Sequence, residues 1–123
     1  MTEKIRVIIT GALGRMGMET AKAIAGDGDM ELVGLVDIRA KGEKLSSLSE
    51  LRELDIKIEN DLDRVIAKTK PQAMVDFTNP QAVFNNARTA LKNKITCVVG
   101  TTGLNEVELR QLEKLAVDNR TGL

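Results

Sequence analysis

Residues 5–17 read IRVIITGALGRMG, a β-branched apolar run that leads into three evenly spaced glycines. The apolar run is typical of a strand buried on both faces of a sheet. Helix-forming residues follow from about Arg15 to Ala25, and Gly26 and Gly28 end them. The stretch therefore predicts a strand, a tight turn and a helix in succession, which is the opening of a βαβ unit.

Beyond this unit, short apolar runs alternate with longer amphipathic stretches, as in a parallel sheet covered by helices. We expect further strands at residues 31–36, 56–58, 73–76 and 95–99. We expect helices from the N-cap Asp61 to just before Pro71, from the N-cap Asn79 and first helical residue Pro80 to about Asn93, and from a capping box of Asn105 and Glu108 toward Asn119. The sequence thus predicts an α/β fold, a doubly wound parallel sheet of the Rossmann type with strand order 3-2-1-4-5.

Two segments have a less regular pattern. Between residues 40 and 60 every third residue of one run is a leucine, as in short helical turns: Leu45, Leu48, Leu51 and Leu54. At the carboxyl end, Gly122 has the position of a helix C-cap, so that Leu123 would begin another element. We therefore expect the chain to be the amino-terminal part of a longer protein, with a complete protein of 123 residues as the alternative.

The composition is that of one globular domain, which we assign to residues 1–123. Apolar residues make up 42%, and 18 basic residues balance 18 acidic ones, so no surface for nucleic acid is expected. The absence of histidine excludes imidazole catalysis and the usual zinc sites, and a single cysteine suits a reducing compartment. Apolar runs of about five residues are too short to span a membrane. We expect a soluble cytoplasmic domain without a metal, membrane or nucleic-acid partner.

The three glycines carry the strongest functional signal. Gly11 permits a tight turn off the strand, Gly14 removes a Cβ where backbone approaches a pyrophosphate, and Gly17 lets the helix pack closely on the strand. The helix N-terminus then offers free N–H groups to phosphate. Asp37 follows Gly17 by 20 positions, where dinucleotide-binding folds carry an acid for the ribose hydroxyls. The spacing is GxxGxxG rather than GxGxxG, and the alternative is a glycine turn that only closes the unit, with Asp37 a loop carboxylate.

Two arginines bear on which dinucleotide would bind. Asp37 would repel a 2′-phosphate and so favours NAD(H), whereas a guanidinium from Arg15 or Arg39 would hold that phosphate. The alternative is that Arg39 and Lys41 are solvated loop charges. We expect either NADH or NADPH to serve, with NADH bound no more weakly.

Two further loops follow the fourth and fifth strands, at residues 77–80 and 100–103. Because the carboxyl ends of parallel strands lie at one edge of a sheet, we expect both loops beside the glycine loop. Their backbone and hydroxyl groups suit a nicotinamide carboxamide and ribose, and the alternative for the second loop is a plain polar turn. We interpret Asp76 as a buried structural carboxylate held by backbone N–H groups, and Cys97 as an inert core thiol.

Four motifs together resemble one family. GALGRMG, VDIR, DFTNP and VVGTTG, at residues 11–17, 36–39, 76–80 and 98–103, are similar to the N-terminal Rossmann domain of the 4-hydroxy-tetrahydrodipicolinate reductase (dihydrodipicolinate reductase) family. The resemblance covers essentially the whole chain. It implies NADH or NADPH as the cofactor and a place in lysine and diaminopimelate biosynthesis.

The resemblance also implies which residues hold the cofactor. It places the pyrophosphate on Gly11, Ala12, Leu13, Gly14, Arg15 and Met16. It places the adenine ribose on Asp37. Arg39 joins this group of residues because its guanidinium would hold a 2′-phosphate. The nicotinamide would lie between two groups of residues: Phe77 and Thr78, and Gly100, Thr101 and Thr102.

The family's second domain has no counterpart in these 123 residues. In the family that domain carries paired histidines and a nearby lysine, binds the dicarboxylate substrate and forms a homotetramer. We therefore assign no catalytic residue and expect this chain to bind the cofactor without turnover. In the intact enzyme the resemblance implies hydride transfer from the nicotinamide to a cyclic dicarboxylate imine-type substrate.

Other functions remain open on the sequence alone. One alternative is a stand-alone NAD(H)-sensing or interaction module without a reaction. Another is the cofactor domain of a related aspartate or homoserine dehydrogenase. A methyltransferase that uses S-adenosylmethionine shares a glycine loop and a strand-end acid, but the GxxGRMG spacing makes it remote.

Overall fold

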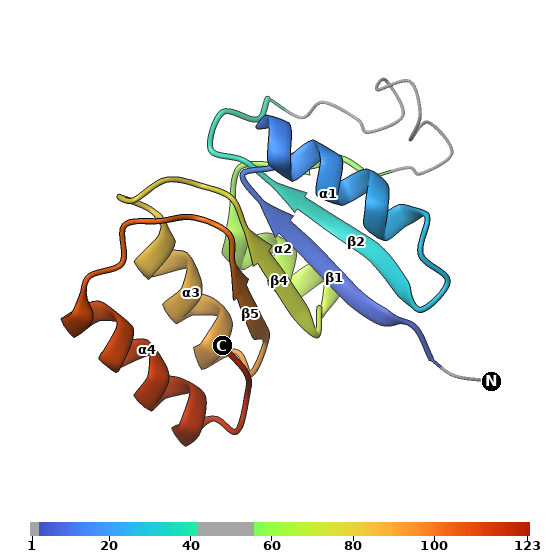
Figure 1. Cartoon of the computed structure of the whole chain (residues 1–123). Helices are drawn as coiled ribbons and strands as arrows, with labels where there is room; N and C mark the ends of the chain where they lie inside the picture. Colours follow the sequence, from blue (N-terminus) through green and yellow to red (C-terminus); the bar gives the residue numbers. More distant parts are fainter. Residues whose placement is uncertain (1–2, 42–55) are drawn as a thin grey trace.

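The computed structural model describes residues 3–41 and 56–123 of the chain. Within these residues, five parallel strands form one sheet in the order β3-β2-β1-β4-β5 (Figure 1). The strands are β1 (Ile5–Thr10), β2 (Met30–Val36), β3 (Ile58–Glu59), β4 (Ala73–Asp76) and β5 (Thr96–Val99). The predicted Rossmann-type sheet and its strand order are confirmed.

Helices cover both faces of this sheet (Figure 1). One face carries α1 (Arg15–Ala25), and the other carries α2 (Leu62–Thr69), α3 (Val83–Lys92) and α4 (Glu106–Asp118). The side chains of β1 alternate between two cores: Val7 and Ile9 pack with α1, and Ile8 packs with α2 and α3. Because both faces are buried at its centre, the strand has consecutive apolar residues at Val7, Ile8 and Ile9, as its sequence indicated.

The expected start signals of two helices are confirmed. Asp61 is the N-cap of α2, and its carboxylate accepts a hydrogen bond from the Arg64 N–H at 3.2 Å. Asn105 and Glu108 form a reciprocal capping box at the start of α4. The leucine-rich run that includes Leu45 lies outside the described residues.

The expected start of α3 is wrong. The helix begins at Val83, and its N-cap is Ala82 rather than Asn79. The side-chain oxygen of Asn79 accepts from the N–H groups of Gln81 and Ala82 at 3.0 and 2.9 Å. Asn79 therefore stabilises a separate turn before the helix, because its short side chain competes successfully with helical hydrogen bonding.

The expected end of α4 near Asn119 is confirmed, but the expected C-cap position of Gly122 is wrong. Asn119 is the C-cap, and the left-handed backbone angle falls on Arg120 (φ 52°) rather than on Gly122. Gly122 instead accepts a hydrogen bond from the Cys97 N–H at 3.0 Å, so the last residues run beside the free edge of β5. In the described ranges no helix has both the length and the apolar composition needed to cross a bilayer.

Candidate functional site

The glycine loop between β1 and α1 lies against the loop after β4. Gly11 has a positive φ of 77°, and a Cβ built on it would be 2.4 Å from the backbone oxygen of Phe77. Any other residue at position 11 would be strained and would push the two loops apart. Gly11 therefore allows both the turn and the contact between the loops.

Gly17 has a different packing partner from the expected one. A Cβ on Gly17 would be 2.3 Å from the carbonyl oxygen of Gly11 and 3.1 Å from the Cα of Ala12. The first turn of α1 thus packs on the backbone of the glycine loop rather than on the strand. This contact fixes the loop directly over the helix N-terminus.

Most N–H groups of the glycine loop already have partners inside the protein. Those of Gly11 and Ala12 donate to the carbonyl of Val36, and that of Gly14 donates to Gly11. The Leu13 N–H donates to Asp37 at 2.9 Å. Together with the full burial of the Ala12 side chain, these bonds make Ala12 and Leu13 part of the loop's frame.

The helix N-terminus is the part of this loop with N–H groups to offer a ligand. Gly14 is the N-cap of α1, and in the described part of the chain no side chain caps that helix end. The first N–H groups of a helix lack intrahelical acceptors, so those of Arg15 and Met16 point out of the helix end. Both side chains are exposed. An anion would meet backbone donors and the positive end of the helix dipole here.

Asp37, directly after β2, is buried and fully engaged. Its Oδ1 accepts from the Arg39 backbone N–H and from Arg39 Nε at 2.9 and 3.0 Å. Its Oδ2 accepts from the Leu13 N–H and from Arg39 Nη2 at 2.9 and 3.0 Å. Asp37 therefore joins the glycine loop to the loop after β2.

These bonds keep Asp37 ionised. Burial raises the pKa of Asp37, but the hydrogen bonds from Arg39 and from the Leu13 N–H outweigh burial and hold the pKa below its ordinary value of 3.8. The same pairing raises the pKa of Arg39, whose side chain remains 63% exposed. A ribose hydroxyl that binds Asp37 has to replace a donor, and the exposed guanidinium is the one that can swing away.

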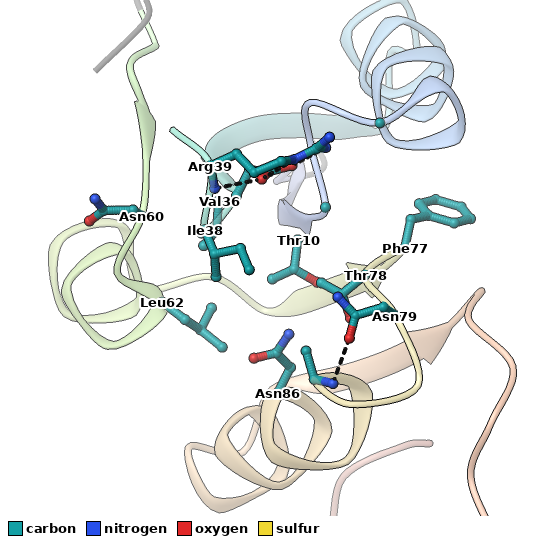
Figure 2. Close-up of a pocket in the computed structure, with 14 residues that line it drawn as sticks. Thr10, Val36, Ile38, Arg39, Asn60, Leu62, Phe77, Thr78, Asn79 and Asn86 are labelled. Carbon is teal, nitrogen blue, oxygen red and sulfur yellow. Dashed lines mark hydrogen bonds and ion pairs between the residues drawn. The ribbon is translucent and has the colours of Figure 1, made fainter. Parts of the chain in front are cut away.

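A cavity of about 500 Å³ extends from Asp37 to the loop after β4 (Figure 2). Six of the predicted site residues line it: Gly11, Gly14, Asp37, Arg39, Phe77 and Thr78. The other predicted residues are outside its lining: Ala12, Leu13, Arg15, Met16, Gly100, Thr101 and Thr102. The structure thus brings the ends of β1, β2 and β4 together around one space.

The cavity also has lining residues that the sequence reasoning missed: Thr10, Val36, Ile38, Asn60, Leu62, Ala82 and Asn86. Figure 2 shows Ile38 and Leu62 on one side of the cavity and Thr78 and Asn79 on the other. The sequence did contain a signal for Ile38, because it is an apolar residue directly after Asp37. In the structure the Ile38 side chain is 76% exposed. Leu62 belongs to a helix face whose sequence pattern does not distinguish a cavity wall from a core, and Asn86 is a polar residue on an amphipathic helix, a pattern typical of a solvent-facing position.

The loops after β4 and β5 pack on each other. The ring of Phe77 lies over Gly100, where an added Cβ would be 2.3 Å from a ring carbon. Gly103, with φ 111°, lies against Pro80, and an added Cβ there would be 2.5 Å from the proline Cβ. Two glycine contacts therefore set the spacing of these loops. Thr102, in the loop after β5, is exposed.

The hydroxyls of these loops bond within the protein. Thr78 and Thr101 donate their hydroxyl protons to Asp76 at 2.7 and 2.9 Å. Toward a ligand their oxygens can therefore act only as acceptors. The interpretation of Asp76 as a buried structural carboxylate is confirmed, although only one of its donors is a backbone N–H, that of Thr78.

Cys97 is buried in β5, as predicted. Burial, together with the negative charge of Asp76, raises the pKa of the Cys97 thiol to about 12. Such a thiol is not a nucleophile at neutral pH. In residues 3–41 and 56–123, no group of three or more His, Cys, Asp or Glu side chains is placed to hold a metal ion.

Residues 5–122 match the family model described as "Dihydrodipicolinate reductase, N-terminus". The chain belongs to this family. A protein of Syntrophomonas wolfei named 4-hydroxy-tetrahydrodipicolinate reductase is 59% identical over 123 residues, which cover 100% of this chain and 46% of the relative. A protein of the same name from Moorella thermoacetica is 39% identical over 122 residues, or 99% of this chain and 46% of the relative.

Solved structures agree with the fold of this dihydrodipicolinate reductase family member. Dipicolinate-bound dihydrodipicolinate reductase from Paenisporosarcina sp. TG-14 superposes with a TM-score of 0.78 at 30% identity, over 95% of this chain and 44% of that one. Homoserine dehydrogenase from S. aureus reaches a TM-score of 0.80 at 20% identity, over 100% of this chain and 32% of that one. At that identity the likeness shows the fold alone.

The chain spans less than half the length of the curated relatives it matches. Both the matched family model and the curated relatives are dihydrodipicolinate reductases. The two alternatives, a stand-alone sensing module and the cofactor domain of another dehydrogenase, are therefore not favoured. The relatives' reaction belongs to proteins about twice as long as this chain.

Proposed function

We propose that this chain is the NADH- or NADPH-binding domain of a 4-hydroxy-tetrahydrodipicolinate reductase. The observation that carries the proposal is the hydrogen bond between Asp37 and the glycine loop. One buried carboxylate accepts the Leu13 N–H of that loop and lies in the same cavity wall as Gly14, the N-cap of α1. A ribose-binding acid and a phosphate-binding helix end thus lie side by side, as dinucleotide recognition requires.

The residues present fit such a cofactor. The diphosphate would lie at the N-terminus of α1 and bind the N–H groups of Arg15 and Met16. The bonds inside the glycine loop assign Gly11, Ala12 and Leu13 to shaping that site. Gly14 would let the diphosphate approach the backbone closely, because it has no Cβ. Among the described residues, the Gly11 oxygen, at 3.3 Å, is the one atom near a Cβ built at position 14.

The two ends of the cofactor would lie at opposite ends of the cavity. The adenosine would lie beside Asp37, with its ribose hydroxyls on the carboxylate and its base against the apolar side chains of Ile38 and Leu62. The nicotinamide would lie at Phe77 and Thr78 and the neighbouring residues 100–102. Gly100, Thr101 and Thr102 would present mainly backbone groups, because the Thr101 hydroxyl proton is already bonded to Asp76.

When bound, the reduced nicotinamide supplies a hydride, which the proposal directs to a cyclic dicarboxylate imine-type substrate of lysine and diaminopimelate biosynthesis. This chain's own residues bind and orient the cofactor, and none is assigned a catalytic role. We expect this chain alone to show no turnover. On the family resemblance, the proposal extends to a homotetramer of the full-length protein, working in the cytoplasm.

Both nicotinamide cofactors would serve, with NADH bound no more weakly than NADPH. For NADH, the Asp37 carboxylate is available to the ribose diol once Arg39 moves. For NADPH, the displaced guanidinium gains a 2′-phosphate partner, while the nearby carboxylate repels that phosphate. These two effects oppose each other, which is the basis for expecting dual use. A preference of tenfold or more for NADPH would contradict it.

Titration of the protein with NADH, followed by nicotinamide fluorescence, tests the proposal directly. The chain has no Trp or Tyr, so protein emission does not interfere. The informative variant is Gly14→Asp. The backbone φ of Gly14, −78°, suits any residue, and an aspartate at a helix N-cap stabilises the helix. Its charge would repel the diphosphate, so we expect the melting temperature to hold and the NADH affinity to fall at least tenfold.

Gly28→Asp is the matched control, because nothing lies within 4 Å of an added Cβ at Gly28. It adds the same charge and should leave NADH affinity unchanged. Wild-type affinity in Gly14→Asp would remove the helix N-terminus from the proposal. Turnover of the substrate by this chain alone would contradict the assignment of chemistry to the rest of the enzyme.

A further inference from the structure

Asp76, at the end of β4, is a fully buried carboxylate with five hydrogen-bond donors. Its Oδ1 accepts from the Thr78 N–H at 3.0 Å, the Thr78 hydroxyl at 2.7 Å and the Thr101 hydroxyl at 2.9 Å. Its Oδ2 accepts from the Thr10 hydroxyl at 2.8 Å and the Asn86 side-chain amide at 3.0 Å. All five donors are neutral groups.

These donors come from four separate parts of the chain. Thr10 ends β1, Asn86 lies on α3, and Thr78 and Thr101 lie on the loops after β4 and β5. Thr10 is 66 residues from Asp76, and Thr101 is 25 residues from it. One carboxylate therefore connects two strand ends, a helix and both loops that pack around Phe77.

A buried charge is costly, and the fold retains it without a cationic partner among these donors. A neutral amide could not replace it fully, because an asparagine has one acceptor oxygen for five donors. The bonds to an ionised acceptor are also stronger than neutral ones. The arrangement favours a role in holding these loops in one geometry, which apolar packing alone would fix less tightly.

We propose that Asp76 is a positioning residue for the nicotinamide end of the cofactor, acting through Thr78 and Thr101. The inference rests on the proposed function, since it concerns the same bound dinucleotide. The carboxylate fixes the loop of Thr78 at Oδ1 and draws the loop of Thr101 to the same oxygen. The main-chain contact between Gly100 N–H and the Asp76 carbonyl, at 2.8 Å, holds the second loop at its base. Asp37 and the helix N-terminus, by contrast, do not contact Asp76 in the described part of the chain.

The two ends of the dinucleotide can be probed separately with NADH and ADP-ribose, because ADP-ribose lacks the nicotinamide. Thr101→Val removes one donor from one loop and keeps the side chain's shape. We expect it to weaken NADH binding about fivefold to tenfold and to change ADP-ribose binding less than twofold. Thr101→Ser keeps the hydroxyl and should restore the NADH affinity. Binding of both ligands is measured by calorimetry with the same protein preparation.

Thr69→Val is the matched control. Its hydroxyl also makes a half-buried hydrogen bond, to the Val65 carbonyl at 2.7 Å, but it lies on α2 outside the cavity. The control should lower the melting temperature without changing the ratio of the NADH and ADP-ribose affinities. A change of that ratio in Thr101→Val alone is therefore not explained by lost stability.

Changes at Asp76 itself complete the test. Asp76→Ala removes the acceptor for all five donors and should weaken NADH more than ADP-ribose. Asp76→Asn keeps an oxygen for the Thr78 N–H, and Asn86 and Thr10 can reverse their hydrogen bonds toward the new amide. It should therefore recover most of the affinity that the alanine variant loses. If Asp76→Ala fails to fold, the Thr101 series decides alone.

The outcomes separate the two proposals. If wild type binds neither NADH nor ADP-ribose, the proposed dinucleotide function fails and the role of Asp76 fails with it. If wild type binds both and Thr101→Val weakens them equally, or weakens neither, dinucleotide binding stands and the positioning role is overturned. A selective loss of NADH, restored by Thr101→Ser, supports the positioning role.

Discussion

The guanidinium of Arg39 lies across both carboxylate oxygens of Asp37, with Nε 3.0 Å from Oδ1 and Nη2 3.0 Å from Oδ2. Two backbone N–H groups, from Leu13 and Arg39, occupy the remaining sites on the carboxylate. A ribose that binds Asp37 therefore competes with Arg39 for the same oxygens. In the proposed complex, binding of the adenosine ribose at Asp37 would therefore displace the exposed guanidinium of Arg39.

Arg39→Ala should separate the two cofactors. It removes the competitor for Asp37 and also the partner of a 2′-phosphate, so we expect NADPH affinity to fall about tenfold and NADH affinity to hold or rise. Parallel fluorescence titrations with NADH and NADPH measure the ratio. Arg110→Ala, an exposed arginine on α4 outside the cavity, is the control and should leave the ratio unchanged. Equal losses of both cofactors in Arg39→Ala would show that the arginine only supports the loop.

The lowered pKa of Asp37 predicts a dependence of stability on pH. Below its ordinary pKa of 3.8, the unfolded chain binds a proton at Asp37 that the folded chain still excludes, so acid favours unfolding. The contribution is complete above 3.8 and is lost as the pH falls through the lowered pKa of the folded state. In urea denaturation, the stability advantage of wild type over Asp37→Asn should therefore shrink on acidification.

Gly17→Ala should destabilise the protein although it introduces a good helix former. The new Cβ would be 2.3 Å from the Gly11 carbonyl oxygen, which is a backbone atom, so the loop backbone itself would have to shift. We expect the free energy of unfolding to fall by about 1–3 kcal/mol. Gly28→Ala, where nothing lies within 4 Å of the added Cβ, should change it by less than about 0.5 kcal/mol. Equal stability of the two variants in chemical denaturation would contradict the packing argument.

Cys97 should be unreactive in the folded protein. Its thiol is buried and its pKa is raised to about 12, so almost no thiolate forms at neutral pH. A chromogenic disulfide reagent should modify one thiol per chain in strong denaturant and none on the same timescale under native conditions. Rapid native labelling at the denatured rate would show that β5 opens readily or that the thiol is not buried.

Local patterns in the sequence predicted most of the fold. The run of β-branched residues, the glycine spacing and the helix N-caps at Asp61 and Asn105 each act within a few residues, and each is confirmed. The predicted start of α3 is wrong because it also depended on a local pattern alone. An asparagine followed by proline suits either a helix N-terminus or a separate turn, and tertiary packing of Pro80 on Gly103 accompanies the turn.

The candidate site was predictable only in part. Gly11, Gly14, Asp37 and Phe77 follow from the rule that ligands bind at the carboxyl ends of parallel strands, and all four line the cavity. Asn86 could not be found this way, because a polar residue on an amphipathic helix reads as solvent-facing. The structure instead turns its amide to Asp76.

Periodicity, glycine spacing and caps are short-range properties, so the succession of strands and helices along the chain and the identity of the glycine loop could be predicted from the sequence. The bonding state of each candidate residue depends on groups tens of residues away. Thr10 and Thr101 both reach Asp76, and Leu13 reaches Asp37, only because the folded sheet brings four strand ends to one edge. Sequence therefore determined which strand-end loops gather at the site, but only part of the set of residues that line it. Tertiary structure decided which of their hydrogen-bonding groups are already used and which are left for a ligand.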